Sequence, residues 1–326
     1  PRDAGACVTA VDDTGTEGAK EKGASSNGAY AGGTAHIDGR LVPLAEARIP
    51  ILDWGFLRSD ATYDVVHVWK GAFFRLEDHL DRFERNMAAL RLDPGLTRPR
   101  IRDILMECVA RSGLRDAYVE MICTRGQPPV GSRDPRKCQN RFYAFTAPFV
   151  FVADENQRAR GLHMRVSERP RIPPESVNPT VKNYHWMDLT AGLFEALDKG
   201  AESVVLTDGR GHVTEGPGFN VFIVTDGRVA TPDVGVLDGI TRRTVIELCG
   251  LEGIPCQARA VAVTELKAAD EVFITSTAGG AMPVTRIDGA PVGEGTPGPI
   301  TQRLSSLYWS KQESGWLATK VEYGDG

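Results

Sequence analysis

The segment Thr214 to Asn220, which reads TEGPGFN, decides the class of fold in this chain. Glycine and proline at its centre predict a turn, and the β-branched and aromatic residues around it predict strands at 212–214 and 220–224. Asp-Gly pairs at 208–209 and 226–227 predict turns to neighbouring strands at 204–206 and 228–230. The second half of the chain is therefore expected to contain an antiparallel meander.

Helices are expected around these strands and before them. Apolar residues recur at steps of three and four from Leu76 to Leu90, which predicts an amphipathic helix, and a second helix is expected to start near Ile101 and end near Gly113. Further helices are predicted at 186–199, 241–250, 264–269 and 299–311. Strands are expected at 117–124 and 141–147, with hairpins turned at 38–39 and 70–71. The predicted class is α+β, with mainly antiparallel sheets.

The length of 326 residues predicts two domains, each with its own core. Residues 1–33 are rich in small and polar residues, which predicts a flexible N-terminal arm. A small N-terminal α/β domain is expected over 34–150 and a large C-terminal domain over 151–326. The polar loop 126–140 between two predicted strands is expected to contact substrate.

Composition excludes several classes of function. The 38 basic and 43 acidic residues are dispersed, which argues against nucleic acid as a partner. No apolar run reaches the roughly 20 residues of a membrane span, and no signal sequence is visible, so a cytoplasmic location is expected. The six cysteines are widely spaced, as in a reduced protein, and the six histidines lack the spacing of a metal site.

Three positions suggest chemistry. Lys182 has apolar and aromatic neighbours just before a predicted helix, which favours a desolvated amine that can attack a carbonyl, although most lysines are solvated surface charges. Glu215 lies in the glycine-rich turn, where an exposed hairpin acid is an equally good interpretation. Gly239 to Thr241 precede an apolar helix pattern, so their backbone N–H groups could bind an anion, or Asp238 could simply cap the helix.

Four segments in one order resemble the fold-type IV pyridoxal-phosphate enzymes, the class IV aminotransferases. They are Val181 to Asn183, Thr214 to Asn220, Leu237 to Arg242 and Ser276 to Gly280. An earlier stretch, Ala47 to Val65, resembles the (R)-selective amine transaminase branch of this family. The resemblance runs from about His36 to about Tyr308, and it implies the two-domain fold of branched-chain and D-amino acid aminotransferases.

The resemblance assigns a cofactor, pyridoxal 5′-phosphate, and residues that bind it. Lys182 is implied to be the catalytic residue, which binds the cofactor covalently and moves a proton between the substrate and C4′ of the cofactor. Glu215 is implied to pair with the pyridine nitrogen. The implied phosphate ligands are Arg82, Gly239, Ile240, Thr241 and Thr277.

The substrate pocket is also implied by resemblance. Its implied walls are Tyr63, Val65, Tyr118, Trp186 and Ala278. Arg133 resembles a mobile arginine that binds the carboxylate of a keto acid, with Arg125 or Arg136 as alternatives. Arg58 stands where the amine transaminases usually have histidine, and an arginine there favours an anionic substrate group.

The expected function is a ping-pong transfer of an amino group from (R)-configured primary amines, with D-amino acids also plausible, to a keto acid such as pyruvate. The resemblance further implies a homodimer or higher homo-oligomer, with a second subunit completing the site. Alternative interpretations are a D-amino acid or branched-chain L-amino acid aminotransferase, a lyase similar to aminodeoxychorismate lyase, and a non-catalytic protein that binds a phosphate ligand.

Overall fold

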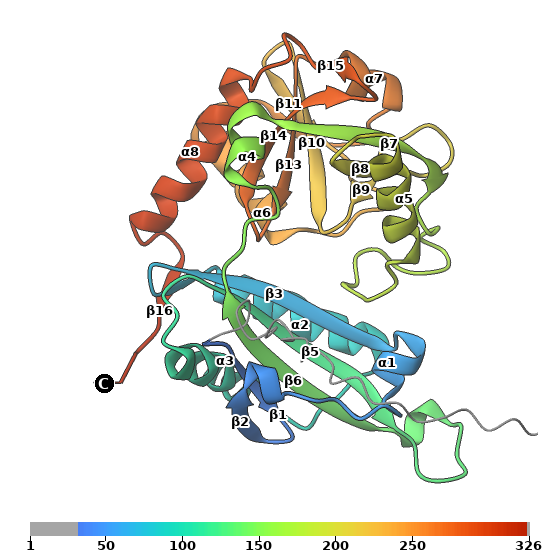
Figure 1. The fold of residues 1–326 in the computed structure, drawn as a ribbon, viewed down its shortest axis with the longest axis vertical. Coiled ribbons are helices and arrows are strands. Elements are labelled where there is room, and N and C mark those ends of the chain that lie inside the picture. Colours follow the sequence, from blue (N-terminus) through green and yellow to red (C-terminus); the bar gives the residue numbers. More distant parts are fainter. Residues whose placement is uncertain (1–31, 325–326) are drawn as a thin grey trace, which may run out of the picture.

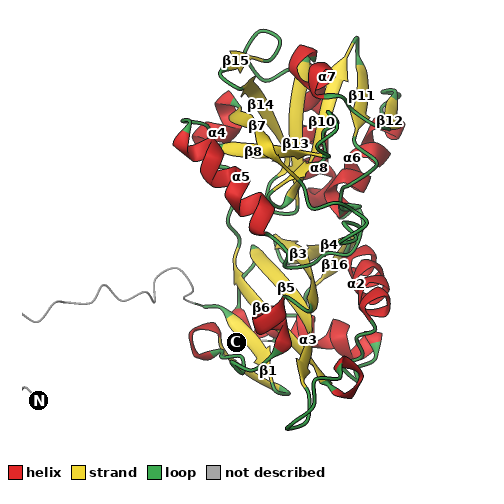
Figure 2. Cartoon of the chain, turned by 90° about the vertical axis from the view of Figure 1, so that its right-hand side faces the viewer, coloured by secondary structure: helices red, strands yellow, loops and turns green. Residues whose placement is uncertain are grey.

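The computed structural model describes residues 32–324 and places two β-sheets one above the other, each with its own helices (Figures 1 and 2). The predicted arm 1–33 lies, apart from its last two residues, outside the described residues. The described helices are α1 (Trp54–Arg58), α2 (Leu76–Leu90), α3 (Arg98–Ser112), α4 (Glu155–Arg160), α5 (Met187–Asp198), α6 (Ile240–Leu251), α7 (Val263–Ala268) and α8 (Pro299–Glu313). The predicted mixture of helices and sheets is confirmed.

The first sheet has seven strands in the order β16-β4-β3-β5-β6-β1-β2, all antiparallel. Two-residue turns at 38–39 and 70–71 join two of the neighbouring pairs, as the Asp-Gly and Lys-Gly pairs predict. The strands are β1 (Thr34–Ile37), β2 (Arg40–Pro43), β3 (Ala61–Trp69), β4 (Ala72–Phe74), β5 (Ala117–Gln127), β6 (Gln139–Pro148) and β16 (Ala318–Lys320).

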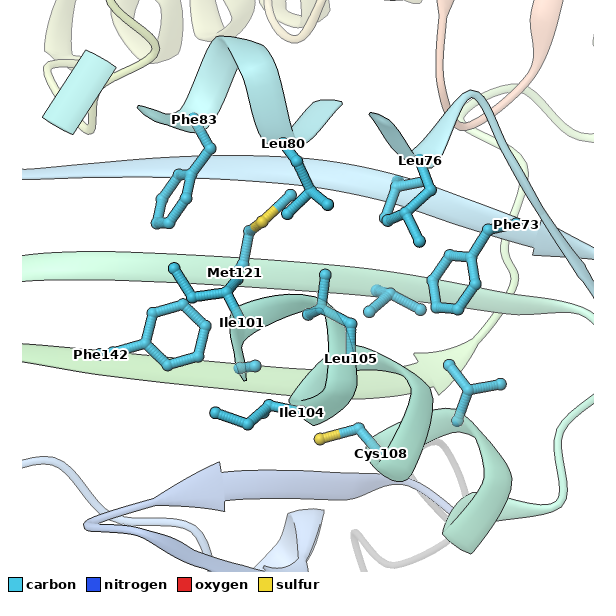
Figure 3. Close-up of a cluster of buried hydrophobic side chains, with 14 of the residues drawn as sticks. Phe73, Leu76, Leu80, Phe83, Ile101, Ile104, Leu105, Cys108, Met121 and Phe142 are labelled. Atoms are coloured by element: carbon cyan, nitrogen blue, oxygen red, sulfur yellow. The ribbon is translucent and has the colours of Figure 1, made fainter. Parts of the chain in front are cut away.

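Helices α2 and α3 cover one face of this sheet. Their apolar stripes meet side chains of β3, β5 and β6 in one buried core, in which Leu80, Phe83, Leu105 and Met121 pack together (Figure 3). Because side chains alternate along a strand, Tyr63 and Val65 of β3 point to the other face, toward the second sheet. That face forms part of the cavity described below.

The second sheet has nine strands. Seven follow the order β12-β11-β10-β13-β14-β7-β8, while β15 pairs with β14 and β9 with β10. Helices α6 and α8 share a core with β10 and β13, and α5 packs on β7 and β8. The strands are β7 (Leu162–Pro170), β8 (Ser203–Thr207), β9 (Glu215–Gly216), β10 (Phe219–Thr225), β11 (Arg228–Thr231), β12 (Cys256–Ala258), β13 (Glu271–Ser276), β14 (Gly280–Ile287) and β15 (Ala290–Pro291).

The predicted meander is only partly correct. The hairpin of β10 and β11 forms at Asp226-Gly227, but β8 pairs in parallel with β7. Residues 212–214 make an isolated antiparallel bridge to Thr207 and no named strand. Helix α5 connects β7 to β8, and such a crossover returns the chain parallel to the strand it left.

The two sheets do not divide the chain at a single point. The chain leaves the first sheet after β6 and builds the second, but β16 returns to pair with β4 in the first sheet. Residues 318–320, predicted to belong to the second domain, therefore lie at the edge of the first sheet.

Candidate active site

A cavity of about 340 Å³ lies between the two sheets. Its walls come from β3 and β5 of the first sheet, from the ends of β10 and β13 of the second, and from the segments before α5 and α6. The structure brings together here twelve of the residues predicted for the site: Tyr63, Val65, Arg82, Tyr118, Lys182, Trp186, Glu215, Gly239, Ile240, Thr241, Thr277 and Ala278.

Lys182 is held by its backbone. Its carbonyl oxygen accepts hydrogen bonds from the Thr62 hydroxyl at 2.7 Å and from the Tyr63 N–H at 3.3 Å. Its side-chain nitrogen lies 4.4 Å from the centre of the Tyr63 ring. A half-buried amine is thus fixed over an aromatic face inside the cavity.

Glu215 is not an exposed hairpin acid, because it is buried on β9 beside the cavity. One carboxylate oxygen accepts a hydrogen bond of 2.8 Å from the Leu237 N–H. The other lies 3.3 Å from two nitrogens of Arg171, whose third nitrogen binds Asp188 at 2.7 Å. Burial raises the pKa of Glu215, while the charge of Arg171 opposes that shift.

The start of α6 provides an anion site. Gly239 occupies the N-cap position and no side chain caps the helix, so the interpretation of Asp238 as a cap is wrong. The Asp238 carboxylate pairs with Arg243 at 2.9 Å instead. The uncapped backbone N–H groups and the helix dipole attract an anion at this end.

Arg82 adds a positive charge to the same end of the cavity. Its guanidinium binds both oxygens of Asp64 at 2.7 Å and the Asp238 carbonyl oxygen at 3.0 Å. The His79 ring contacts Asp64 at 2.7 Å. Burial alone would raise the pKa of Asp64, but Arg82 and His79 hold it far below its usual value. A fixed ion pair in the core therefore orients the arginine.

The residues present fit a phosphorylated aromatic aldehyde. Arg82, the first turn of α6 and Thr277 suit a phosphate, Glu215 suits a protonated ring nitrogen, and Lys182 suits the aldehyde carbon. Glycine is required at 239, since a Cβ atom there would lie 2.1 Å from the Asn220 side-chain oxygen. Asn220 in turn donates to the Leu237 carbonyl oxygen at 2.9 Å and fixes the loop before α6.

Two predicted substrate residues do not line this cavity. Arg58 is exposed, stacks on Trp54 at 3.4 Å, and lines a neighbouring cavity of about 360 Å³. Arg133 is exposed in the loop 126–140. The alternatives are engaged elsewhere, because Arg125 pairs with Asp60 and Arg136 with Asp134. Neither Arg58 nor Arg133 therefore lines the cavity of a single chain, and the substrate roles expected for them stay predictions.

The sequence did not reveal several residues that support the site. Arg171, Asp64, His79 and Glu120 are buried polar residues, and each has a partner from 15 to 64 residues away. A signal existed for two of them. Asp64 interrupts an apolar strand, and His79 lies three residues before Arg82 on the apolar face of α2, so their pairing could have been inferred.

Other classes of site find no support in the described residues. Between residues 32 and 324, no group of three or more histidine, cysteine or acidic side chains is arranged to hold a metal ion. Over the same residues, no helix has both the length and the hydropathy that a membrane span requires.

Comparison with known proteins identifies relatives over most of the chain. A family model described as amino-transferase class IV matches residues 61–287. A putative branched-chain-amino-acid aminotransferase of Methanocaldococcus jannaschii is 32% identical over 84% of this chain and 94% of its own. A D-alanine aminotransferase of Bacillus licheniformis is 29% identical over 83% of this chain and 94% of its own.

The fold has solved counterparts as well. The branched-chain amino acid aminotransferase of Thermobaculum terrenum, solved in its PLP form, superposes with a TM-score of 0.78 at 26% identity, over 89% of this chain and 98% of that one. The branched-chain aminotransferase of Thermoproteus uzoniensis with norvaline gives a TM-score of 0.81 at 29% identity, over 89% and 99% of the two chains.

Proposed function

The chain belongs to the class IV aminotransferases, which depend on pyridoxal phosphate, and we propose that it transfers an amino group from (R)-configured primary amines to a keto acid such as pyruvate. The (R) preference rests on the resemblance of residues 47–65 to the amine transaminase branch.

The site residues divide the work between binding and proton transfer. When bound, pyridoxal phosphate supplies an aldehyde that captures the amine and a ring that takes up the electrons of the broken C–H bond. Lys182 would hold this group covalently, and its free amine would be the base that moves a proton between the substrate carbon and C4′. Glu215 keeps a proton on the ring nitrogen, and Arg82 with the first turn of α6 anchors the phosphate.

One observation carries the preference for amines over amino acids. Among the described residues, the arginines that line the cavity are Arg82 and Arg171, and each is already paired with a buried carboxylate. Arg82 is needed for the phosphate and Arg171 for Glu215, so neither is left to bind a substrate carboxylate. Aromatic rings of Tyr63, Tyr118 and Trp186 form much of the remaining wall and suit an apolar substituent.

A D-amino acid or branched-chain L-amino acid aminotransferase is the second candidate. The relatives that carry those names cover more than four fifths of this chain. Arg58 also offers an exposed guanidinium close to the cavity wall, since the cavity that it lines shares Val181 and Asn183 with the proposed active site.

The half-reaction of the purified holoenzyme tests the proposal. The enzyme is mixed separately with (R)-1-phenylethylamine, (S)-1-phenylethylamine, D-alanine and L-leucine, and loss of the visible absorbance band is followed. Rapid loss with the (R)-amine and not with the (S)-amine supports the proposal, whereas loss only with L-leucine moves the chain to the branched-chain group. Lys182→Ala cannot hold the cofactor covalently. It should therefore lack the absorbance band of the lysine-bound cofactor, and it should convert none of the donors.

We further propose that the enzyme works in the cytoplasm as a homodimer or a higher homo-oligomer. All five cysteines in the described part are free thiols, as expected in a reducing compartment. Large apolar side chains around α1 are exposed, including Ile51 at 72% and Phe56 at 64%. Such a cluster is typical of a surface that a partner covers.

A further inference from the structure

Glu120 is a buried carboxylate beside the proposed substrate pocket, and the mechanism above does not use it. It lies on β5 directly opposite Val65 of β3, so the two side chains share a face of the sheet. Val65 lines the cavity, as does Tyr118, which lies two residues before Glu120 on the same face. Only 8% of Glu120 is exposed.

Both oxygens of Glu120 accept hydrogen bonds from phenols. The Tyr184 hydroxyl donates to one oxygen at 2.6 Å, and the Tyr118 hydroxyl donates to the other at 3.1 Å. Tyr184 stacks on Tyr63 with ring centres 4.3 Å apart. Hydrogen bonds donated to a carboxylate favour its ionised form.

The charge of Glu120 is not neutralised nearby. Within residues 32–324, no cationic side chain makes an ion pair with it. Burial raises the pKa of Glu120, and the two phenols and the charge of Lys182 oppose that shift. In the proposed function Lys182 is joined to the cofactor at rest, so its amine is not a permanent counter-ion.

We propose that Glu120 determines substrate specificity, because its carboxylate beside Val65 and Tyr118 weakens the binding of substrates that carry a carboxylate. A keto-acid acceptor such as pyruvate meets the same repulsion, so it binds, but weakly. The inference rests on the proposed function, which places the substrate in this cavity. Charges closer together than the Debye length of about 10 Å at 0.1 M salt are screened only weakly by solvent ions, and a ligand inside a cavity of about 340 Å³ lies within that distance of the cavity wall. Donors with uncharged substituents avoid this repulsion.

Two variants separate the charge of Glu120 from its role as an anchor. Glu120→Gln removes the charge at nearly constant shape, while Glu120→Asp keeps the charge but shortens the reach to Tyr184. The probes are propanoate and its neutral amide, propanamide, which have no amino group to transfer. Each is titrated into the holoenzyme, and binding is followed by the change in the visible absorbance band.

The wild-type enzyme should bind propanamide more tightly than propanoate. Glu120→Gln should bind propanoate about tenfold more tightly than the wild type does, equivalent to about 1.4 kcal/mol, and should change propanamide binding less than about twofold. Glu120→Asp should keep the wild-type preference for the amide.

Three results would overturn the proposal. The first is unchanged propanoate binding in Glu120→Gln. The second is an equal change of propanoate affinity in Glu120→Gln and Glu120→Asp, which would mean that Glu120 only anchors the two tyrosines. The third needs no variant, and it is equal binding of the two probes by the wild type. Because the probes do not react, these results are independent of the half-reaction with (R)-1-phenylethylamine, which tests the proposed function itself.

Discussion

At the scale of single residues, the ion pair of Arg171 with Glu215 holds the Glu215 carboxylate in place beside the cavity. Both side chains are buried, so removing one leaves an unpaired charge in the core. We expect Arg171→Met to lower the free energy of unfolding by about 3 kcal/mol, the usual cost of breaking a buried pair from one side. Chemical denaturation of the wild type and the variant measures the difference.

Arg169 provides the matched control for this substitution. It lies two residues earlier on β7, is exposed, and makes no ion pair within the described residues. Arg169→Met should change the free energy of unfolding by less than about 0.5 kcal/mol. Equal destabilisation by the two substitutions would show that the buried pair contributes nothing beyond a surface arginine.

The sequence predicts residues that belong to local patterns and misses those whose partners are distant. Lys182, Glu215 and Gly239 lie in short segments that can be recognised one by one, and all three line the cavity. Arg171 lies in a polar stretch with nothing unusual, and its partner Glu215 is 44 residues away. Only the folded chain shows that this arginine is buried.

At the scale of secondary structure, the start of α6 depends on the glycine that precedes it. A Cβ atom at residue 239 would push on the Asn220 side chain and disturb the loop that opens the helix. We expect Gly239→Ala to weaken pyridoxal phosphate binding by about tenfold or more, because the backbone N–H groups of the first turn would be displaced. Cofactor titration of the apoenzyme by fluorescence measures the affinity.

Gly250 in the same helix offers the opposite expectation. A Cβ atom there would meet no heavy atom within 4 Å, and alanine is the better helix former. Gly250→Ala should raise the free energy of unfolding by about 0.5 to 1 kcal/mol and leave cofactor affinity unchanged. Weakened cofactor binding in both variants would mean that α6 responds to any change in its stability, and that the contact with Asn220 is not the cause.

The contact between β3 and α8 makes stability depend on pH. His67 of β3 is buried, binds Gln312 of α8 at 2.7 Å, and has a pKa lowered to about 4, chiefly by burial. Between about pH 6.5 and 4 the unfolded chain binds a proton at His67 that the folded chain does not. Folding is therefore weakened as the pH falls through this range.

Replacement of this histidine should remove its share of the pH dependence. His67→Gln keeps a side-chain nitrogen that can donate to Gln312 but does not titrate. Between pH 7 and pH 4, the free energy of unfolding should fall by about 3 kcal/mol less in the variant than in the wild type. Denaturant unfolding at several pH values measures this, and parallel curves for the two proteins would contradict it.

Secondary-structure elements with a strong local period were predicted well. The apolar stripe of α2 and the turn at Asp226-Gly227 are encoded by neighbouring residues, and both form as expected. The pairing of β8 was not predicted. Its partner β7 lies parallel to β8, and helix α5 separates the two strands in the sequence. The alternation of residues within a strand does not specify which other strand lies beside that strand.

At the scale of the whole molecule, the length of the sequence predicts two domains, but not how the chain is shared between the two sheets. The first sheet packs one core against α2 and α3, whereas the second sheet packs a separate core on each of its two faces. The return of β16 to the first sheet was not predictable, because three residues carry too little pattern to indicate a partner more than 240 residues away. The number of subunits in the oligomer is equally hard to predict from the sequence, because it depends on contacts between distant parts of the surface.

The exposed apolar residues around α1 predict that a second copy of the chain covers this surface. Ile51, Leu52 and Phe56 are each more than 60% exposed, although the rest of the first sheet buries its large apolar side chains. Phe56→Asp would place a charge at the centre of this patch, and burying an unpaired charge in an apolar interface costs several kcal/mol. We expect the wild type to migrate as a dimer or larger oligomer and Phe56→Asp to shift toward monomer, as measured by light scattering after size-exclusion chromatography.

Val130→Asp, at a fully exposed apolar residue in the loop 126–140, is the control for a new surface charge outside α1. A wild-type monomer, or a Phe56→Asp variant as oligomeric as the wild type, would show that this surface faces solvent.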